Sequence, residues 1–229
     1  MRQYLPGHDM DNRHADPVID FAAILCSRLC HDLVSPVGAL ANGIEILAEE
    51  EDPDIRAQVL TLLEDSARQT ASRLQFFRLA FGAGGGFGAQ VDLREARKAT
   101  DALLEKSKVK ALWQHDEGLL PKDAVKLVLN LLLLASETMV RGGELNISVR
   151  QQAGTIQCDI VAQGDRIIFN DTVRLALTTD MAGQAIDPRC APARLAYMTA
   201  AQLGTGIAVG APAEGQLAFS VAIPAGQAA

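Results

Sequence analysis

The sequence has no excess of basic residues. Its 229 residues include 21 lysines and arginines against 28 aspartates and glutamates, which gives a net charge of −7. Nucleic-acid-binding proteins normally present a basic face, so this balance argues against nucleic acid as a partner. Long apolar runs are also missing: the longest, residues 125–135, is interrupted by Lys126 and Asn130 and is too short to span a bilayer. We therefore expect no membrane partner.

Cysteines are few, and the first residues lack the apolar core of a secretory signal peptide. Four cysteines without an export signal predict reduced thiols in the cytoplasm rather than a disulfide framework. What the chain does have is 48% hydrophobic residues, and its length allows one large domain or two smaller ones, each with a core. Residues 1–15 are polar, and we expect them to be disordered.

Apolar residues recur at helical spacing in the first part of the chain. Asp16 can cap a helix and Pro17 suits its first turn, so a helix is predicted from there to about Leu47. One face carries an apolar stripe: Cys26, Leu29, Leu33, Pro36, Leu40, Ile44 and Leu47. His31 falls roughly 160–180° from the middle of this stripe by helical-wheel geometry. Its ring is therefore predicted to stand in solvent, with small residues on neighbouring turns (Ser27, Ser35, Gly38 and Asn42).

Pro36 interrupts this predicted helix. It has no N–H to donate, so the carbonyl of Asp32 is left free and the helix should bend one turn after His31. A charged turn leads to a second helix, predicted to end near Phe81, whose inner side carries Ile55, Val59, Leu62, Leu63, Leu74, Phe77 and Phe81. Residues 16–81 thus form a helical hairpin. A lone hairpin cannot bury both stripes, so a homodimer with a four-helix bundle is expected.

A glycine-rich run at residues 82–88 is predicted to be a hinge between domains. Beyond it, residues 89–225 change pattern. Helices are predicted near residues 93–107, 121–140, 171–178 and 192–203, and strands near residues 111–114, 144–150, 155–162, 206–210 and 216–223. This order predicts a largely antiparallel sheet with helices. The fold class is therefore α+β, with an N-terminal hairpin and a C-terminal α/β sandwich.

The run His31-Asp32-Leu33-Val34-Ser35-Pro36 resembles the phosphoacceptor motif of bacterial sensor histidine kinases, where an acid follows the histidine and a proline stands five residues on. The whole chain is more closely similar to the histidine phosphotransferases of bacterial cell-cycle phosphorelays. The telling segments are SRLCHDLVSPVGALANGIEIL, SRLQFFRLAFGAGG and LLPKDAVKLVLNLLLL. The resemblance implies a hairpin for dimerisation and histidine phosphotransfer, followed by a domain with the fold of the kinase ATPase domain.

The chain departs from the kinases where they bind nucleotide. Asn130 matches the first of two asparagines on a kinase helix, but Leu134 stands where the second, a magnesium ligand, is expected. The adenine-binding motif D-x-G-x-G is matched best by residues 162–166, which have lost the aspartate and the second glycine. Between Thr178 and Ala193 only Gly183 remains of the glycine-rich lid. Leucine cannot coordinate magnesium, so we expect a degenerate ATPase-fold domain without ATP and a protein with no cofactor of its own.

The resemblance implies a route for the phosphoryl group. His31 takes it from an aspartyl phosphate on the receiver domain of a hybrid histidine kinase and passes it to an aspartate on the receiver domain of a downstream response regulator. The receiver supplies the Mg²⁺. Asp32 orients or tunes the ring, whereas Ser35 and Arg28 could contact the ring or the phosphoryl group. The expected seat for the receiver is formed by Ile24, Val34, Gly38, Ala41 and Asn42.

Three other interpretations stay open. The chain could be an ATP-dependent histidine kinase, or a purely structural dimer or scaffold that binds receivers without transfer. A third possibility is a metal site formed by Cys26, Cys30 and His31, since cysteines four residues apart share a helix face. Against that site, His31 points away from the cysteines on the helical wheel, and both cysteines fit the apolar stripe.

Overall fold

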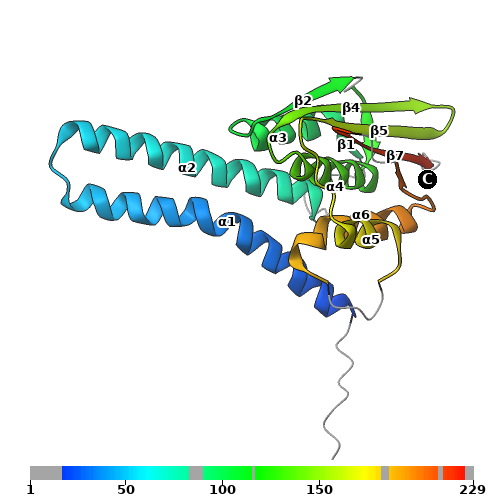
Figure 1. Ribbon diagram of the computed structural model, residues 1–229, viewed down its shortest axis with the longest axis horizontal. Helices are drawn as coiled ribbons and strands as arrows, with labels where there is room; N and C mark the ends of the chain where they lie inside the picture. Colours follow the sequence, from blue (N-terminus) through cyan, green and yellow to red (C-terminus); the bar gives the residue numbers. More distant parts are fainter. Residues whose placement is uncertain (1–16, 83–89, 115–116, 182–185, 211–213, 225–229) are drawn as a thin grey trace, which may run out of the picture.

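The computed structural model describes residues 17–82, 90–114, 117–181, 186–210 and 214–224. The expected disordered start, residues 1–15, lies outside these ranges, and so does nearly all of the expected hinge at 82–88. The chain begins with a hairpin of two long helices, α1 (Pro17–Glu49) and α2 (Pro53–Ala80), which lie side by side in Figure 1. Asp52 caps α2 by accepting hydrogen bonds from the N–H groups of Asp54 and Ile55.

The predicted apolar stripes are only partly used within one chain. Pro36, Val59 and Phe77 are buried, and Gly43 lets α1 approach α2, since a Cβ there would lie 2.7 Å from Leu63 Cδ2. Other predicted inner residues are exposed: Cys26, Ile44, Ile55, Leu62 and Leu74. Helical periodicity marks apolar faces without saying which face meets which partner, and the expected homodimer, in which a second hairpin would cover these five residues, stays a prediction. Two helices have more apolar surface than one contact can cover.

After the hairpin, helices and strands alternate in an α/β sandwich. In chain order they are β1 (Gln90–Asp92), α3 (Leu93–Leu104), β2 (Val109–Gln114), β3 (Leu119–Pro121), α4 (Lys122–Thr138), β4 (Gly143–Gln152), β5 (Thr155–Gln163), α5 (Asp171–Thr178), the 3₁₀ turn η1 (Pro188–Cys190), α6 (Ala191–Gln202), β6 (Ala208–Val209) and β7 (Gln216–Pro224). The main sheet has the strand order β2-β4-β5-β7-β6. Its β2–β4 pair is parallel and the other pairs are antiparallel. The sheet is thus largely antiparallel, as predicted.

The α+β class is confirmed, and three short elements were missed. The strands β1 and β3 pair with each other in a separate two-stranded sheet, and η1 precedes α6. The β4–β5 hairpin turns at Ala153 and Gly154, as predicted, and both residues have positive φ (46° and 78°). Such a pair is typical of the tight hairpin turns that match the twist of the strands.

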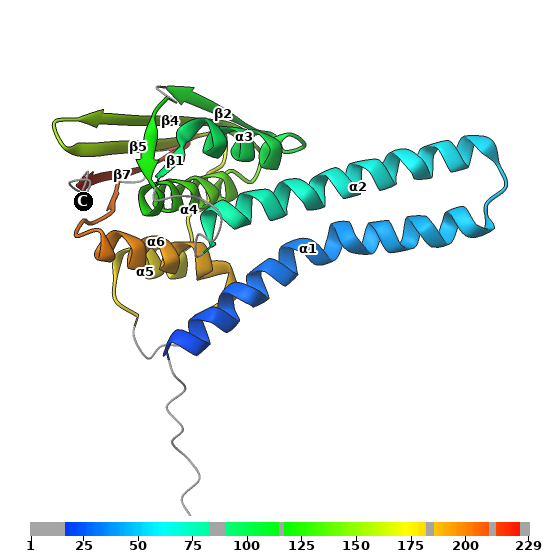
Figure 2. The ribbon, with the colours of Figure 1, turned by 180° about the vertical axis from the view of Figure 1, so that it is seen from behind.

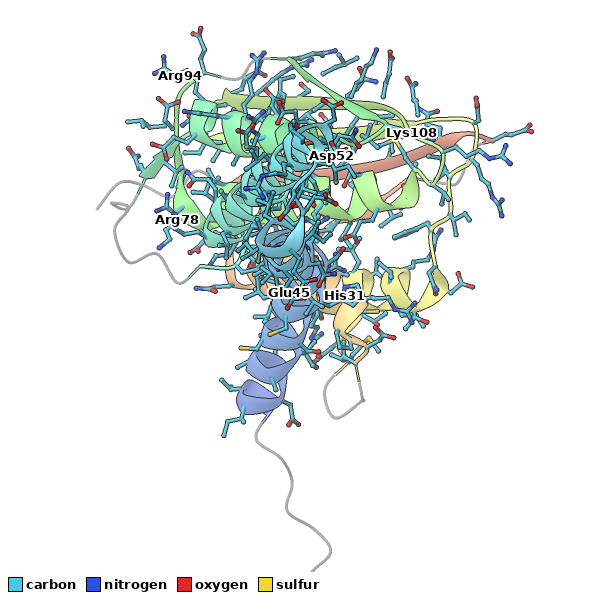
Figure 3. The ribbon with its side chains drawn as sticks, turned by 90° about the vertical axis from the view of Figure 1, so that its left-hand side faces the viewer. His31, Glu45, Asp52, Arg78, Arg94 and Lys108 are labelled. Carbon is cyan, nitrogen blue, oxygen red and sulfur yellow. The ribbon has the colours of Figure 1, made fainter. Side chains whose placement is uncertain are left out.

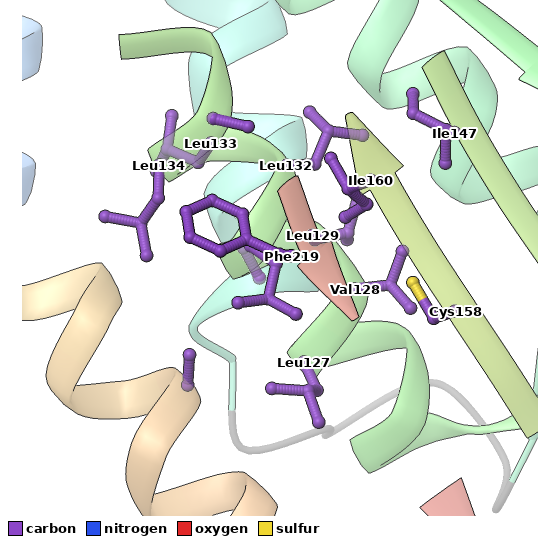
Figure 4. Packing of buried hydrophobic residues seen from close by; sticks show 14 of the residues in the cluster. Leu127, Val128, Leu129, Leu132, Leu133, Leu134, Ile147, Cys158, Ile160 and Phe219 are labelled. Carbon is purple, nitrogen blue, oxygen red and sulfur yellow. The ribbon is translucent and has the colours of Figure 1, made fainter. Parts of the chain in front are cut away.

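The core of the sandwich is built around α4. Its residues from Leu127 to Ala135 are all buried, and they pack between the sheet and α6. Figure 4 shows this leucine-rich helix against Ile147, Ile160 and Phe219 from three strands. Each of these strands alternates buried with less buried residues, so one face of the sheet meets the helices.

The end of α2 belongs to the same core. Phe76, Phe77 and Ala80 are buried in one cluster with residues of α3 and α4. The side-chain amide of Asn130 adds a polar link, because its Nδ2 donates to the carbonyl of Ala80 at 2.8 Å. The hairpin is therefore anchored on the sandwich by packing as well as by chain connection (Figure 2). Among the described residues, no helix is long and apolar enough to cross a membrane.

Candidate functional site

His31 lies on α1 with its ring in solvent. Its side chain is 77% exposed, in agreement with the helical-wheel prediction. Figure 3, which views the molecule from the tip of the hairpin, places His31 beside the segment that leads into α6. An exposed imidazole on a helix is accessible to a macromolecular partner.

Asp32 holds this ring in a defined orientation. The Nδ1 atom of His31 lies 3.0 Å from Asp32 Oδ1. An ionised carboxylate can only accept hydrogen bonds, so the contact requires the proton on Nδ1. The lone pair of the neutral ring is then on Nε2, the nitrogen turned away from Asp32. The orientation favours Nε2 as the nucleophile.

Arg28 supports Asp32 from the preceding turn. Its Nε donates to Asp32 Oδ2 at 2.9 Å, and its Nη2 donates to Glu137 Oε1 on α4. The Arg28 side chain is only 9% exposed. Burial by itself would lower the pKa of Arg28, but the charges of Glu137 and Asp32 outweigh it and raise the pKa above its ordinary value. Because two carboxylates already hold this guanidinium, its placement favours an action through Asp32.

Glu137 was not singled out in the sequence. The surrounding protein raises its pKa by desolvation, although 37% of the side chain reaches solvent, and the nearby charge of Arg28 offsets only part of this effect. The Arg28–Glu137 pair joins α1 to the C-terminal end of α4. Sequence reasoning could place Glu137 near the end of a helix but had no information on how that helix faces α1.

Pro36 has the predicted effect on the backbone. Figure 2 shows that α1 changes direction along its length. The carbonyl of Asp32, which Pro36 leaves without its helical partner, accepts a hydrogen bond from Nη1 of Arg73 on α2. Asp32 is thus held at its backbone by one arginine and at its carboxylate by another. Arg73 is the second residue that the sequence analysis missed.

A pocket of about 380 Å³ opens next to His31 and Arg28. Its other walls come from α4, from the segment before and within α5, and from η1: Leu134, Glu137, Thr138, Ile168, Phe169, Asn170, Thr172, Val173, Asp187, Arg189 and Cys190. Arg189 donates to Asp187, and this hydrogen bond lowers the pKa of Asp187 to about 2. The sandwich therefore contributes a wall, with charged and apolar patches, beside the histidine.

The remaining predicted residues follow α1 along the side of His31. Ser35, which lies one turn after His31, is exposed. Val34, Ala41 and Asn42 are also exposed, whereas Ile24 and Gly38 are half-buried. A Cβ at Gly38 would meet no atom within 4 Å, so this position faces open space. The expectation that these residues seat a receiver stays a prediction.

The residues matched to nucleotide binding have other surroundings here. Asn130 is fully buried and donates to the carbonyls of Ala80 and Lys126. Leu134 is buried in the core, and Ala162 is buried on the inner face of β5. Cys26 and Cys30 are exposed in the single chain, so the hairpin alone does not cover them. In the part of the chain that the structure describes, no group of three or more His, Cys, Asp or Glu residues is arranged to hold a metal ion.

The structure joins a two-helix hairpin, which carries an exposed histidine, to an α/β sandwich. Comparison with known proteins is more specific. Residues 93–215 match the family described as the histidine phosphotransferase C-terminal domain. A solved bacterial phosphotransferase superposes with a TM-score of 0.78 at 32% identity, over 89% of this chain and 96% of that one. The chain belongs to the histidine phosphotransferase family.

Among curated relatives, the protein phosphotransferase ChpT of Brucella abortus (strain 2308) is 44% identical over 129 residues. That match covers 56% of this chain and 60% of the relative, so the alignment spans about three fifths of the ChpT length. The histidine kinase AdeS of Acinetobacter baumannii gives a TM-score of 0.44 at 12% identity, over 86% of this chain and 98% of that one.

Proposed function

We propose that the protein is a phosphorelay histidine phosphotransferase with His31 as the phosphoacceptor. The observation that carries this proposal is the geometry of His31: an exposed ring whose Nδ1 is bound to Asp32, so that Nε2 is free to attack. Membership of the histidine phosphotransferase family and the similarity to a solved phosphotransferase support it.

The transfer would run between two receiver domains. Nε2 of His31 attacks the phosphorus of an aspartyl phosphate on the receiver of a hybrid kinase, a P–N bond forms, and the P–O bond to the aspartate carboxylate breaks. The phosphoryl group then passes from Nε2 to the aspartate of a response regulator. Both steps need positioning and charge neutralisation more than covalent help, and the receiver's acidic pocket and its Mg²⁺ supply the latter.

The chain's own residues prepare the ring. Asp32 fixes the tautomer, and it stabilises the positive charge that the ring gains during attack. Arg28 holds Asp32 in place, and Ser35, one helical turn after His31, would contact the phosphoryl group. The strip formed by Ile24, Val34, Gly38, Ala41 and Asn42 seats the receiver in this proposal.

The proposal includes a homodimer. Large apolar side chains on the hairpin are exposed in the single chain, including Val37, Ile44, Ile55, Leu60 and Leu62. Exposed apolar surface of this extent is typical of an interaction site, and a second hairpin would cover it in a four-helix bundle. The receivers of such relays act in the cytoplasm, and we place the protein there.

The protein would need no nucleotide of its own. Leu134 offers a buried hydrocarbon where a magnesium ligand would stand, and Asn130 uses its amide for the link to Ala80. Ala162 has no group to bind an adenine amino group. These substitutions favour a domain that keeps its fold for a purpose other than ATP binding.

Transfer from a phosphorylated receiver tests the proposal. Wild-type protein should gain label from a receiver charged with radioactive phosphate and pass it to a second receiver, whereas His31→Ala should gain none. Equal labelling of the two proteins would exclude His31 as the acceptor. Labelling by radioactive ATP alone would favour a histidine kinase, and receiver binding without transfer would favour a scaffold.

A further inference from the structure

Arg73 makes a contact that its position in the chain does not suggest. It lies on α2, 41 residues after Asp32, and its Nη1 donates to the main-chain carbonyl oxygen of Asp32. The arginine is half-buried beneath the bend in α1, where it also lines a small pocket with Arg28, Phe77 and Glu137. The guanidinium of Arg73 therefore binds the backbone of α1 at the residue next to His31.

The acceptor is the one carbonyl that Pro36 releases. In a regular helix the carbonyl of residue 32 would accept from the N–H of residue 36, and proline has no N–H. Pro36 is buried, so a polar group left unpaired beside it would be costly. Arg73 supplies the missing donor through a charged group, which makes a stronger hydrogen bond than a neutral one.

Asp32 is consequently fixed at both of its ends. Its backbone is held by Arg73, and its carboxylate is held by Arg28 while it orients the ring of His31. We propose that Arg73 is a positioning residue for phosphotransfer: it holds the bend that Pro36 makes in α1 at Asp32, and so fixes the direction in which His31 projects. This inference rests on the proposed role of His31 as the acceptor.

The first test is the rate of transfer from a phosphorylated receiver at saturating receiver concentration. Arg73→Met removes the donor and should slow transfer about tenfold or more, since small errors in placement are costly for positioned reactions. Arg73→Lys keeps a charged donor and should recover part of the rate. Arg68→Met makes the same chemical change at an exposed position of α2 and should leave the rate unchanged.

A second substitution separates positioning from general stability. Pro36→Ala restores an N–H that can pair with the Asp32 carbonyl within α1. The hydrogen bond from Arg73 to this carbonyl is then no longer needed. The loss of rate caused by Arg73→Met should then shrink to less than about twofold in the Pro36→Ala background, as expected for coupled residues. An equal loss in both backgrounds would overturn the proposal, and so would full activity of Arg73→Met alone.

The contact can also be followed without any receiver. In NMR spectra, labelling aspartate carbonyls with ¹³C and leucine nitrogens with ¹⁵N selects the peptide bonds between Asp and Leu. The sequence has two such pairs, Asp32-Leu33 and Asp92-Leu93. Arg73→Met should move the Asp32 carbonyl signal and leave that of Asp92 in place. If neither signal moves, the contact is absent in solution and the proposal fails. If the signal moves but wild type transfers no phosphate, the proposed function is what fails.

Discussion

Asp32 has contacts on three sides, to His31, Arg28 and Arg73. Asp32→Asn should therefore affect both activity and folding. It removes the charge that Arg28 faces and allows either ring tautomer, so we expect transfer to slow by about tenfold or more. Loss of one partner from a largely buried charge cluster should lower the free energy of unfolding by about 1–3 kcal/mol, with Glu137 still paired to Arg28.

Urea unfolding and receiver transfer measure these two effects of Asp32→Asn. Asp187→Asn is a matched control, because it breaks an aspartate–arginine pair on the surface of the same pocket. It should change stability far less. Similar stability in wild type and Asp32→Asn would mean that the cluster around Arg28 contributes nothing to folding.

The cysteines divide by environment. Burial raises the pKa of Cys158 to about 12, so at pH 8 its thiol is neutral as well as inaccessible. We expect Cys158 to resist alkylation until the sandwich unfolds, because the thiolate is the reactive species. Mass spectrometry after iodoacetamide treatment, with and without denaturant, checks this. Labelling of Cys158 in the native protein at the rate of an exposed thiol would contradict the packing of β5 against α4.

At this scale the sequence was most informative about neighbours along one helix. The exposed ring of His31, the acid beside it and the free carbonyl before Pro36 all follow from helical geometry and proline chemistry. The partners Arg73 and Glu137 do not, because they come from other helices. A pattern along one segment contains no information about the angle at which another segment crosses it.

Among the elements, α1 allows a direct comparison of two glycines. A Cβ at Gly38 would meet open space, whereas one at Gly43 would lie 2.7 Å from Leu63. Gly38→Ala should stabilise the protein by up to about 1 kcal/mol through helix propensity. Gly43→Ala gains the same propensity but must displace Leu63, so we expect no net gain or a loss of about 1 kcal/mol.

Thermal unfolding measures the stability of the two alanine variants. Equal stabilisation by alanine at both positions would mean that α1 and α2 are less closely packed than the structure shows.

Receiver binding tests Gly38 separately. Gly38→Leu should fold but bind receivers more weakly if this position is part of their seat, with Asn146→Leu on the sheet as a neutral control.

Long elements were predicted well and short ones were not. The predicted helix at residues 171–178 coincides with α5, and each long strand of the main sheet was found within two residues of its ends. The three-residue strands β1 and β3 are too short to show a periodicity of their own, and they form because their residues pair with partners 27 to 31 positions away in the chain. The apolar stripes of the two long helices were predicted, but Ile44 and Leu62 are exposed in the single chain, because periodicity alone does not identify the packing partner of an apolar face.

For the whole molecule, Asn130 connects the hairpin to the sandwich. Asn130→Ala would leave the carbonyl of Ala80 buried without its donor, at a cost of about 1–3 kcal/mol in the free energy of unfolding. Because the hydrogen bond from Asn130 to Ala80 does not involve nucleotide, the decrease in the free energy of unfolding should be the same with and without ATP and Mg²⁺. Calorimetry of wild type, Asn130→Ala and the surface variant Asn146→Ala checks it, and a loss seen only with nucleotide would restore the kinase interpretation.

The association state depends on the exposed apolar face of the hairpin. Val37→Lys and Ile44→Lys place charges on that face and should shift the proposed homodimer to monomer, as measured by light scattering at several concentrations. Leu112→Lys, also exposed but on strand β2, should leave the mass unchanged. A wild-type protein that is monomeric at all concentrations would exclude the four-helix bundle.

The last turns of α2 share their core with α4, and the Arg28–Glu137 pair joins α1 to the end of the same helix. A rotation of the sandwich relative to the histidine would therefore have to disrupt the packing of α2 on α4 and the Arg28–Glu137 pair. A protein of this build would meet its donor and its acceptor with one unchanging surface, so successive partners must compete for it. Under the proposed function, their order of arrival would then depend on their concentrations and affinities.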